Sequence, residues 1–218
     1  MSSRLKNIFN KVTAAVVAVA FLFALNPGIA FAATFGQTSD NGNTQTFSAA
    51  RMYLSSAAPA SSGTVTSATC RNWVSATGSY SSKVVVYTNL AGTPVTSLAE
   101  SDAVTVSATA EQANVYAFSG ANQIAIVSGT TYWFGIFAAD PGTPSFVISR
   151  ANTAAQVHFM STAYPTVPAT FTSGGTAAGP HDCFITYTEA GGGGATTTAQ
   201  LRIGSGLLQW GSGMLYSR

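Results

Sequence analysis

The sequence has few charged residues. Asp, Glu, Lys and Arg make up 7% of its 218 residues, whereas a typical soluble domain contains about a quarter. Nine bases face seven acids, but three of the bases, Arg4, Lys6 and Lys11, lie near the N-terminus. Without residues 1–32, six bases minus seven acids leave a net charge of −1. No basic cluster follows Lys11, which argues against nucleic-acid binding, and the low net charge permits self-association.

The sequence also lacks an apolar run long enough to span a bilayer as a helix. The run from Val12 to Leu25 has 14 residues, and a spanning helix needs about 20. It follows basic residues, ends at an Asn-Pro-Gly break and precedes small residues at Ala30 and Ala32, an order typical of a secretory signal peptide. We therefore predict a signal peptide over residues 1–32, with membrane contact only before its cleavage, and a secreted, extracellular or cell-surface protein. A retained N-terminal anchor is the alternative.

Cysteine is scarce, since Cys70 and Cys183 are the only two. An even number of cysteines in an exported chain favours a disulfide. We therefore predict a Cys70–Cys183 bridge, with two buried free thiols as the alternative. The sequence has no C-x-x-C motif or Cys/His cluster of the kind that indicates a metal site.

Residues suited to catalysis are few. The only histidines are His158, within an apolar stretch, and His181, which lies next to Asp182. Nucleophilic catalysis requires a base beside the nucleophile, and neither histidine lies in a recognisable nucleophile motif. Most carboxylates fall in predicted turns, where acids act as turn formers. We therefore predict that the protein is not an enzyme.

One loop near the N-terminus offers oxygen ligands for a cation. Asp40, Asn41 and Asn43 surround a glycine there, and Glu100 and Asp102 form a second acidic loop. A calcium ion needs six or more oxygen ligands, and a loop with one carboxylate is more often a simple turn. We expect no cofactor, and we keep Asp40, Asn41 and Asn43 as candidate ligands of a structural calcium ion.

Helical periodicity is hard to find after residue 33. Short β-rich runs recur every 8–15 residues between clusters of Gly, Pro, Asn and Ser, and the nearly continuous apolar run 83–87 indicates a strand covered on both faces. Because strands without intervening helices cannot form a parallel sheet, we predict an all-β fold, an antiparallel two-sheet jelly-roll sandwich over residues 33–189. The predicted strands are 46–54, 64–74, 82–88, 103–107, 114–118, 123–127, 131–138, 145–149, 156–160 and 182–188.

A glycine-rich stretch separates the predicted sandwich from the C-terminus. We predict a Gly/Thr-rich linker over residues 190–198 and an apolar tail over 199–218 that contains two related segments, GSGLL and GSGML. Two copies are too few for a solenoid. The tail is predicted either to pack on its own sandwich or to dock on another copy or another protein. Its candidate contact residues are Leu207, Leu208, Trp210, Met214, Leu215 and Tyr216.

Several strand and turn segments follow an order found in known modules. The segments are 62–67, 83–89, 92–94, 97–101, 128–136 and 182–187. In this order the chain resembles the jelly-roll sandwich modules of secreted bacterial surface proteins and phage tail-associated proteins, over about residues 35–188. The resemblance implies an adhesive, glycan-binding or structural unit that is not itself an enzyme. No defined binding motif accompanies it, so it assigns no functional residues.

Aromatic side chains are the usual platform for a sugar, because a planar ring stacks on the apolar face of a pyranose. Trp73 and Tyr80 border the predicted loop 75–79 and form our candidate exposed pair, with core or rim positions as the alternative. Trp133 lies within an aromatic strand and is expected in the core.

Two functions are compatible with these features. The first is a secreted, non-catalytic β-sandwich protein with a structural or adhesive role at a cell surface, with carbohydrate binding as an option. The alternative is a structural subunit of an extracellular filament, envelope layer or phage particle, in which the C-terminal tail makes the subunit contacts. The predicted partners are a surface glycan, an envelope component or further copies of the chain.

Overall fold

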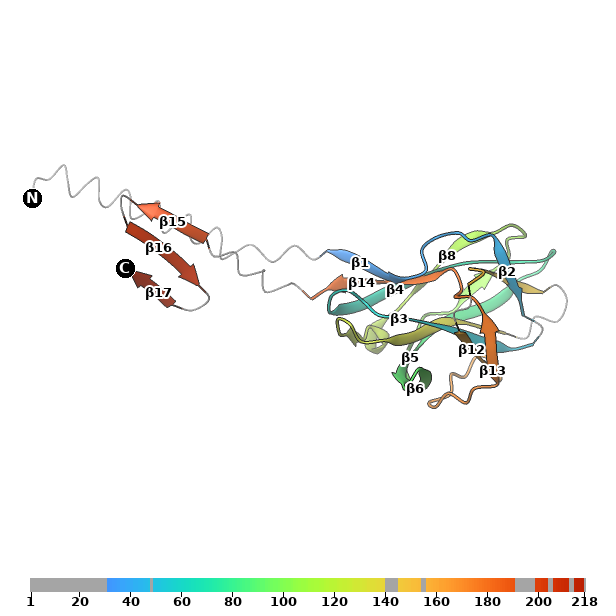
Figure 1. The fold of residues 1–218 in the computed structure, drawn as a ribbon. Helices are drawn as coiled ribbons and strands as arrows, with labels where there is room; N and C mark the ends of the chain where they lie inside the picture. The colour runs from blue at the N-terminus through green and yellow to red at the C-terminus, as the bar shows by residue number, and fades with distance from the viewer. Residues whose placement is uncertain are drawn as a thin grey trace, which may run out of the picture. The chain divides into compact units, whose positions relative to one another are not determined.

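The computed structural model of the chain describes residues 31–47, 49–139, 145–153 and 156–190, and the strands at 199–203, 206–211 and 214–217 (Figure 1). These residues belong to two compact units, Phe31–Ala190 and a unit that contains the C-terminal strands. The predicted signal peptide and linker lie almost entirely outside the described residues. In the part of the chain that is described, no helix has the length and apolar character needed to cross a membrane.

Two antiparallel sheets make up the unit Phe31–Ala190, and its described residues contain no α-helix. The first sheet has the order β1 (Ala32–Gly36), β14 (Cys183–Glu189), β4 (Gly63–Val74), β11 (Phe146–Arg150) and β2 (Asn43–Thr46), and β8 (Gln112–Ala117) and β9 (Ala125–Ile126) also pair with β4. The second sheet has the order β13 (Gly175–Ala178), β12 (Gln156–Ser161), β3 (Arg51–Ala57), β10 (Tyr132–Ala138), β5 (Tyr80–Leu90) and β6 (Thr93–Glu100), with β7 (Val104–Val106) beside β5. A short 3₁₀ turn, Gly120–Asn122, precedes β9.

The two sheets enclose a shared apolar core, so the predicted all-β sandwich of two antiparallel sheets is confirmed. We call this cluster the inter-sheet core. Its large buried members include Phe35, Phe47, Tyr53, Val84, Val86, Tyr116, Phe134, Ile136, Phe146, Ile148, Ile185 and Tyr187. They alternate along their strands with residues of the opposite face, as the two-residue period of a β-strand requires.

A second apolar cluster covers the other face of the second sheet. This outer core contains Met52, Leu54, Val85, Tyr87, Trp133, Phe137, Met160 and Phe171. The segment 162–174, here called the cover segment, contributes Phe171 and the partly buried Tyr164 and Val167. Val84 and Val86 thus pack in the inter-sheet core and Val85 in the outer core. The prediction that the run 83–87 is covered on both faces is confirmed.

A disulfide links the two cysteines inside the first sheet. Cys70 of β4 and Cys183 of β14 are opposite each other in the strand register, with their Cα atoms 4.2 Å apart. Both are buried in the inter-sheet core. The predicted pairing is therefore confirmed. Such bonds persist mainly in oxidising environments, so the disulfide is consistent with an extracellular location.

The prediction of a single strand over residues 46–54 is wrong. β2 ends at Thr46 in the first sheet, and β3 begins at Arg51 in the second. Between them Phe47 is fully buried, and its ring meets the rings of Tyr53 and Phe146 edge to face. Phe47 thus lies in the inter-sheet core at the point where the chain passes from one sheet to the other.

Within the unit Phe31–Ala190, β1, β6 and β13 fall outside every predicted strand, and β2 overlaps one only at Thr46. β1 begins at Ala32, the predicted end of the signal peptide, and pairs with β14 (Figure 1). β6 contains Pro94, a residue that disfavours a strand assignment, and pairs with β5 at the edge of the second sheet. β13 has the sequence GTAA and pairs with β12. Each depends on a neighbouring strand more than on its own apolar pattern.

The described part of the C-terminal tail forms a three-stranded antiparallel sheet in the order β15 (Ala199–Ile203), β16 (Gly206–Gly211) and β17 (Met214–Ser217). The register places Leu201 opposite Leu208, and Trp210 opposite Leu215. The predicted contact residues fall in two of these strands, with Leu207, Leu208 and Trp210 in β16 and Met214, Leu215 and Tyr216 in β17.

Candidate functional site

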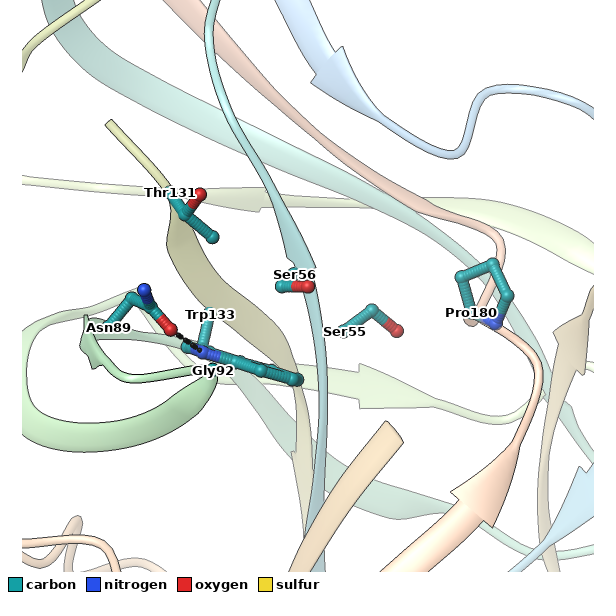
Figure 2. Close-up of a pocket in the computed structure, with 7 residues that line it drawn as sticks. All are labelled: Ser55, Ser56, Asn89, Gly92, Thr131, Trp133 and Pro180. Carbon is teal, nitrogen blue, oxygen red and sulfur yellow. Dashed lines mark hydrogen bonds between the residues drawn. The ribbon is translucent and has the colours of Figure 1, made fainter. Parts of the chain in front are cut away.

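A pocket of about 410 Å³ lies where β3 and β5 end and β10 begins in the second sheet. We call it the Trp133 pocket, and its lining residues are Ser55, Ser56, Asn89, Gly92, Thr131, Trp133 and Pro180. Figure 2 shows Asn89 and Trp133 on one side, Pro180 on the other and the two serines between them. Small-molecule sites usually measure roughly 300–1,000 Å³, so this volume is sufficient for a small ligand.

Contacts on two sides hold the Trp133 side chain in place. Its Nε1 donates a hydrogen bond to Asn89 Oδ1 at 2.9 Å, as Figure 2 shows. The His158 ring meets the indole edge to face, with ring centroids 4.9 Å apart. Because only 3% of Trp133 is exposed, the pocket offers little ring surface for stacking. The prediction that Trp133 is a core residue is confirmed, and its place is the outer core.

A tight turn between β5 and β6 forms one wall of the pocket. Leu90 and Thr93 are paired in the register, and both residues between them have left-handed backbone angles, with φ of 49° at Ala91 and 81° at Gly92. Two consecutive left-handed residues characterise the type I′ hairpin turn. Glycine adopts this conformation freely, whereas an alanine there costs roughly 1 kcal/mol. The turn places Gly92 in the pocket lining and Asn89 at the end of the preceding strand.

The two histidines are buried on opposite sides of β3. His158 is in contact with Trp133, and its Nδ1 lies 3.1 Å from Ser173 Oγ. Burial lowers the pKa of His158. His181 packs edge to face on Tyr53, and neither of its ring nitrogens has a hydrogen-bond partner among the described residues.

Burial is also the main cause that lowers the pKa of His181 to about 3, with the Arg150 guanidinium as the second cause. Its imidazole is therefore neutral at ordinary pH. A general base acts through a ring nitrogen that reaches the proton it removes. In the described structure the ring nitrogens of His181 are instead enclosed without a partner.

The loop with the candidate calcium ligands is bonded to a buried carboxylate. Asn41 donates to Asp182 from its backbone N at 3.1 Å and from Nδ2 at 2.7 Å, and Ser149 Oγ donates to the same carboxylate at 2.7 Å. Asp40 Oδ1 accepts from Gly42 N, and Asn43 Nδ2 donates to Asn41 O. These bonds give the loop a structural role. Among the described residues no group of three or more His, Cys, Asp and Glu side chains converges as a metal site would require.

Glu100 and Asp102, the acids of the second predicted loop, each bind a protein side chain. Glu100 lies 3.2 Å from Lys83 Nζ and forms an ion pair with it. Asp102 accepts a hydrogen bond from Ser119 Oγ at 2.6 Å.

The structure does not bring Trp73 and Tyr80 together as a pair. Trp73 is half-buried near the end of β4, opposite Val147 of β11 in the first sheet. It alternates with the buried Asn72 and Val74, so it lies on the face away from the inter-sheet core. Tyr80, at the start of β5 in the second sheet, packs against that core. A shared stacking platform is therefore not formed by these two residues.

The lining of the Trp133 pocket was not recognised from the sequence, apart from the burial of Trp133. Its polar residues are Ser55, Ser56, Asn89 and Thr131, which are common residue types and occur in three separate segments. The one local signal is the Ala91-Gly92 pair, which marks the turn beside Asn89.

No protein-family model matches this chain, and no curated protein matches it. Among solved structures, a chain from the structure of infectious bursal disease virus Gx strain is similar over 73% of this chain, with 13% sequence identity and a TM-score of 0.31. The similar region spans 36% of the viral chain. A likeness at this TM-score gives no basis for assigning a function.

Proposed function

We propose that the chain is an exported, non-catalytic β-sandwich protein that acts through contact, in an adhesive or structural role at a cell surface or outside the cell. The observation that carries this proposal is the buried Cys70–Cys183 disulfide within a two-sheet sandwich. A disulfide of this kind is typical of oxidising compartments. The basic and apolar N-terminal segment, read as a signal peptide over residues 1–32, agrees with it.

The finer topology that we propose is a jelly roll. Successive strands repeatedly change sheet, from β3 in the second sheet to β4 in the first and β5 in the second, and again from β10 to β11 to β12. Late strands also pair with early ones, as β14 does with β4 and β12 with β3. This arrangement supports the resemblance to the jelly-roll modules of secreted bacterial surface proteins and phage tail-associated proteins.

The state of the histidines supports a role without catalysis. His181 is neutral and its ring nitrogens are enclosed, and His158 is buried against Trp133. Neither has a carboxylate partner among the hydrogen bonds of the described residues, as the base of a nucleophilic site has. The partner that we propose is a surface glycan, an envelope component or a further copy of the chain, and the net charge of −1 for the mature chain (six bases, seven acids) permits association between copies.

Cell fractionation with mass spectrometry of the purified protein tests the proposal. We expect the protein in the extracellular or surface fraction, with a mature N-terminus at Ala33 and with Cys70 and Cys183 oxidised. Gel mobility should then change on reduction. A cytosolic protein with an intact Met1 and two reduced thiols would contradict the proposal.

A second function is supported by the C-terminal sheet. Its three strands have an apolar sequence that includes Leu201, Leu208, Trp210 and Leu215, and an apolar sheet is stabilised when another surface covers it. The alternative is therefore a structural subunit of a filament, envelope layer or phage particle, with this sheet in the subunit contact.

Sedimentation of the mature chain and of a chain that ends at Glu189 separates the two functions. The subunit function predicts concentration-dependent assembly of the full mature chain and a monomeric truncated chain. Equal sedimentation of both chains as monomers would rule out the tail as the assembly contact. The truncation leaves nearly all of the unit Phe31–Ala190 intact.

A further inference from the structure

The lining of the Trp133 pocket is neutral and rich in hydrogen-bonding groups. Ser55, Ser56 and Thr131 contribute hydroxyls, Asn89 contributes a carboxamide, and none of the lining residues is ionisable. A charged ligand would lose hydration in this pocket without gaining a charged partner, which is costly. The lining therefore favours an uncharged ligand with several hydroxyl groups.

Asn89 holds its amide group in a defined orientation. An indole N–H can only donate, so the 2.9 Å contact with Trp133 Nε1 must be made by the Asn89 oxygen. The Nδ2 group is then left with two donors, and it has no hydrogen-bond partner among the described residues. A fixed donor of this kind can bond to a ligand hydroxyl without first losing a bond to the protein.

Ser55 and Ser56 can also form hydrogen bonds with a ligand. Ser55 Oγ accepts a hydrogen bond from His181 N at 3.0 Å, which leaves the hydroxyl proton of this buried residue available to donate. Ser56, the next residue, is exposed. Gly92, Pro180 and the edge of the Trp133 indole supply apolar wall, against which the C–H groups of a compact ring can pack. Figure 2 shows these groups around a common space.

We propose that the Trp133 pocket binds a single neutral hexopyranose unit, through hydrogen bonds from Asn89 and the serines and without ring stacking. This inference rests on the proposed function, because a sugar-binding pocket gives an exported contact protein its partner class. It assigns recognition to residues other than Trp73 and Tyr80, the candidate pair from the sequence.

Titration of the oxidised chain, followed by amide chemical shifts in NMR, tests the pocket. The neutral probes are D-glucose, D-galactose and D-mannose, and the charged counterparts are D-glucuronate and D-glucosamine. At least one neutral sugar should give saturable shifts at Ser55, Ser56 and Asn89. The charged sugars should bind about 10-fold more weakly, the equivalent of one lost hydrogen bond to a desolvated group.

Two variants identify the site. Asn89→Asp keeps an oxygen for Trp133 Nε1 but removes the free amide donors and adds a negative charge, and Ser56→Tyr fills the pocket from an exposed position. Each should weaken sugar binding by about 10-fold or more. Gln123→Glu adds the same charge at an exposed residue outside the pocket and should leave binding unchanged. If Asn89→Asp does not fold, Ser56→Tyr alone decides.

Three results would overturn the pocket proposal. They are no saturable shift with any neutral probe, equal binding of the charged probes, or unchanged binding in both variants. The fractionation experiment above is independent of them. An exported, oxidised protein that binds no hexose would refute the pocket and leave the proposed function standing, whereas a cytosolic, reduced protein would refute the proposed function itself.

Discussion

The inter-sheet core and the outer core use similar residues but are closed in different ways. Two whole sheets cover the inter-sheet core, and a disulfide lies within it. The outer core has a sheet on one side and the cover segment, residues 162–174, on the other, with Tyr164, Val167 and Phe171 as its apolar contacts. Loss of packing in the first should therefore unfold the unit as a whole, whereas loss in the second should open it locally.

The comparison also explains the strands that are buried on both faces. Every residue of β10 is buried, since Phe134 and Ile136 point into one core and Trp133 and Phe137 into the other. The cover segment is held to the edge of the second sheet by backbone hydrogen bonds, from Phe171 N to Val95 O at 2.7 Å and from Ser97 N to Ala169 O at 2.9 Å. The outer core therefore depends on a few contacts made by one segment.

Removal of the disulfide should have the largest effect. The double variant Cys70→Ala/Cys183→Ala opens a loop with a sequence separation of 113, for which chain entropy gives a loss of roughly 4–5 kcal/mol. Because the bond lies in the inter-sheet core, the loss should appear in the global unfolding free energy measured in urea. Reduced wild-type protein should show a similar midpoint. A change below about 1 kcal/mol would contradict the assignment of the bond as a main constraint on the unfolded chain.

The second-largest effect is expected from acid, which should lower the free energy of unfolding. His181 has a pKa of about 3 in the folded protein and an ordinary value of 6.5 when unfolded, so between these values only the unfolded chain takes up the proton. Stability is then full above pH 6.5 and falls with decreasing pH, by about 3 kcal/mol at pH 4. Urea unfolding at several pH values measures the slope.

A histidine variant shows whether this slope belongs to His181. His181→Phe keeps a ring against Tyr53 and should flatten the loss between pH 6.5 and 4. Some slope should remain, because burial also lowers the pKa of His158. Identical pH dependence in the variant and the wild type would assign the effect to other groups.

A substitution in the cover segment should have a smaller and local effect. Phe171→Ala removes a ring that packs edge to face on Tyr87, with centroids 5.6 Å apart. We expect a cost of about 2 kcal/mol, below the roughly 3–5 kcal/mol of a fully enclosed Phe, because the cover segment can settle into the gap. Hydrogen exchange should accelerate in residues 162–174 and the outer core. The exposed Thr172→Ala serves as the control, and uniform acceleration over both cores would contradict separate opening.

The smallest effect is expected from one hydroxyl. Tyr87 donates from its Oη to Pro168 O at 2.7 Å, and burial raises the pKa of Tyr87 to about 12, so the proton is retained across the ordinary pH range. Tyr87→Phe should cost about 1 kcal/mol and increase the rate at which a protease cuts the cover segment. An unchanged rate would mean that this bond does not hold the segment in place.

Much of the sandwich can be predicted from the sequence, because its signals are local. β4 and β10 are continuous β-rich runs, and both predicted spans lie within one residue of the observed bounds. The run 83–87 indicates burial on both faces through its lack of polar alternation. The pairing of Cys70 with Cys183 needs only an even cysteine count and an exported chain.

The candidate site could not be predicted, because long-range packing creates it. In the sequence, nothing distinguishes Asn89 and Ser56 from other polar residues. They line a pocket only because β10 pairs with both β3 and β5 and places Trp133 between them. In the sequence, the loop that contains Asp40, Asn41 and Asn43 offers oxygen ligands for a cation. In the structure, the side-chain amide of Asn41 is hydrogen-bonded to Asp182, which is 141 residues away in the chain. A sequence pattern cannot anticipate such a partner.

The two ends of the unit Phe31–Ala190 leave it side by side. Ala33, the proposed mature N-terminus, is opposite Tyr187 of β14, the strand that ends at Glu189. β4 begins at Gly63, opposite Glu189, and its 12 residues extend to Val74, or roughly 36 Å at the usual rise per residue, where a loop follows. This loop therefore lies at the end of the unit that is farthest from its two chain termini, and a group fused to either terminus would leave the loop accessible.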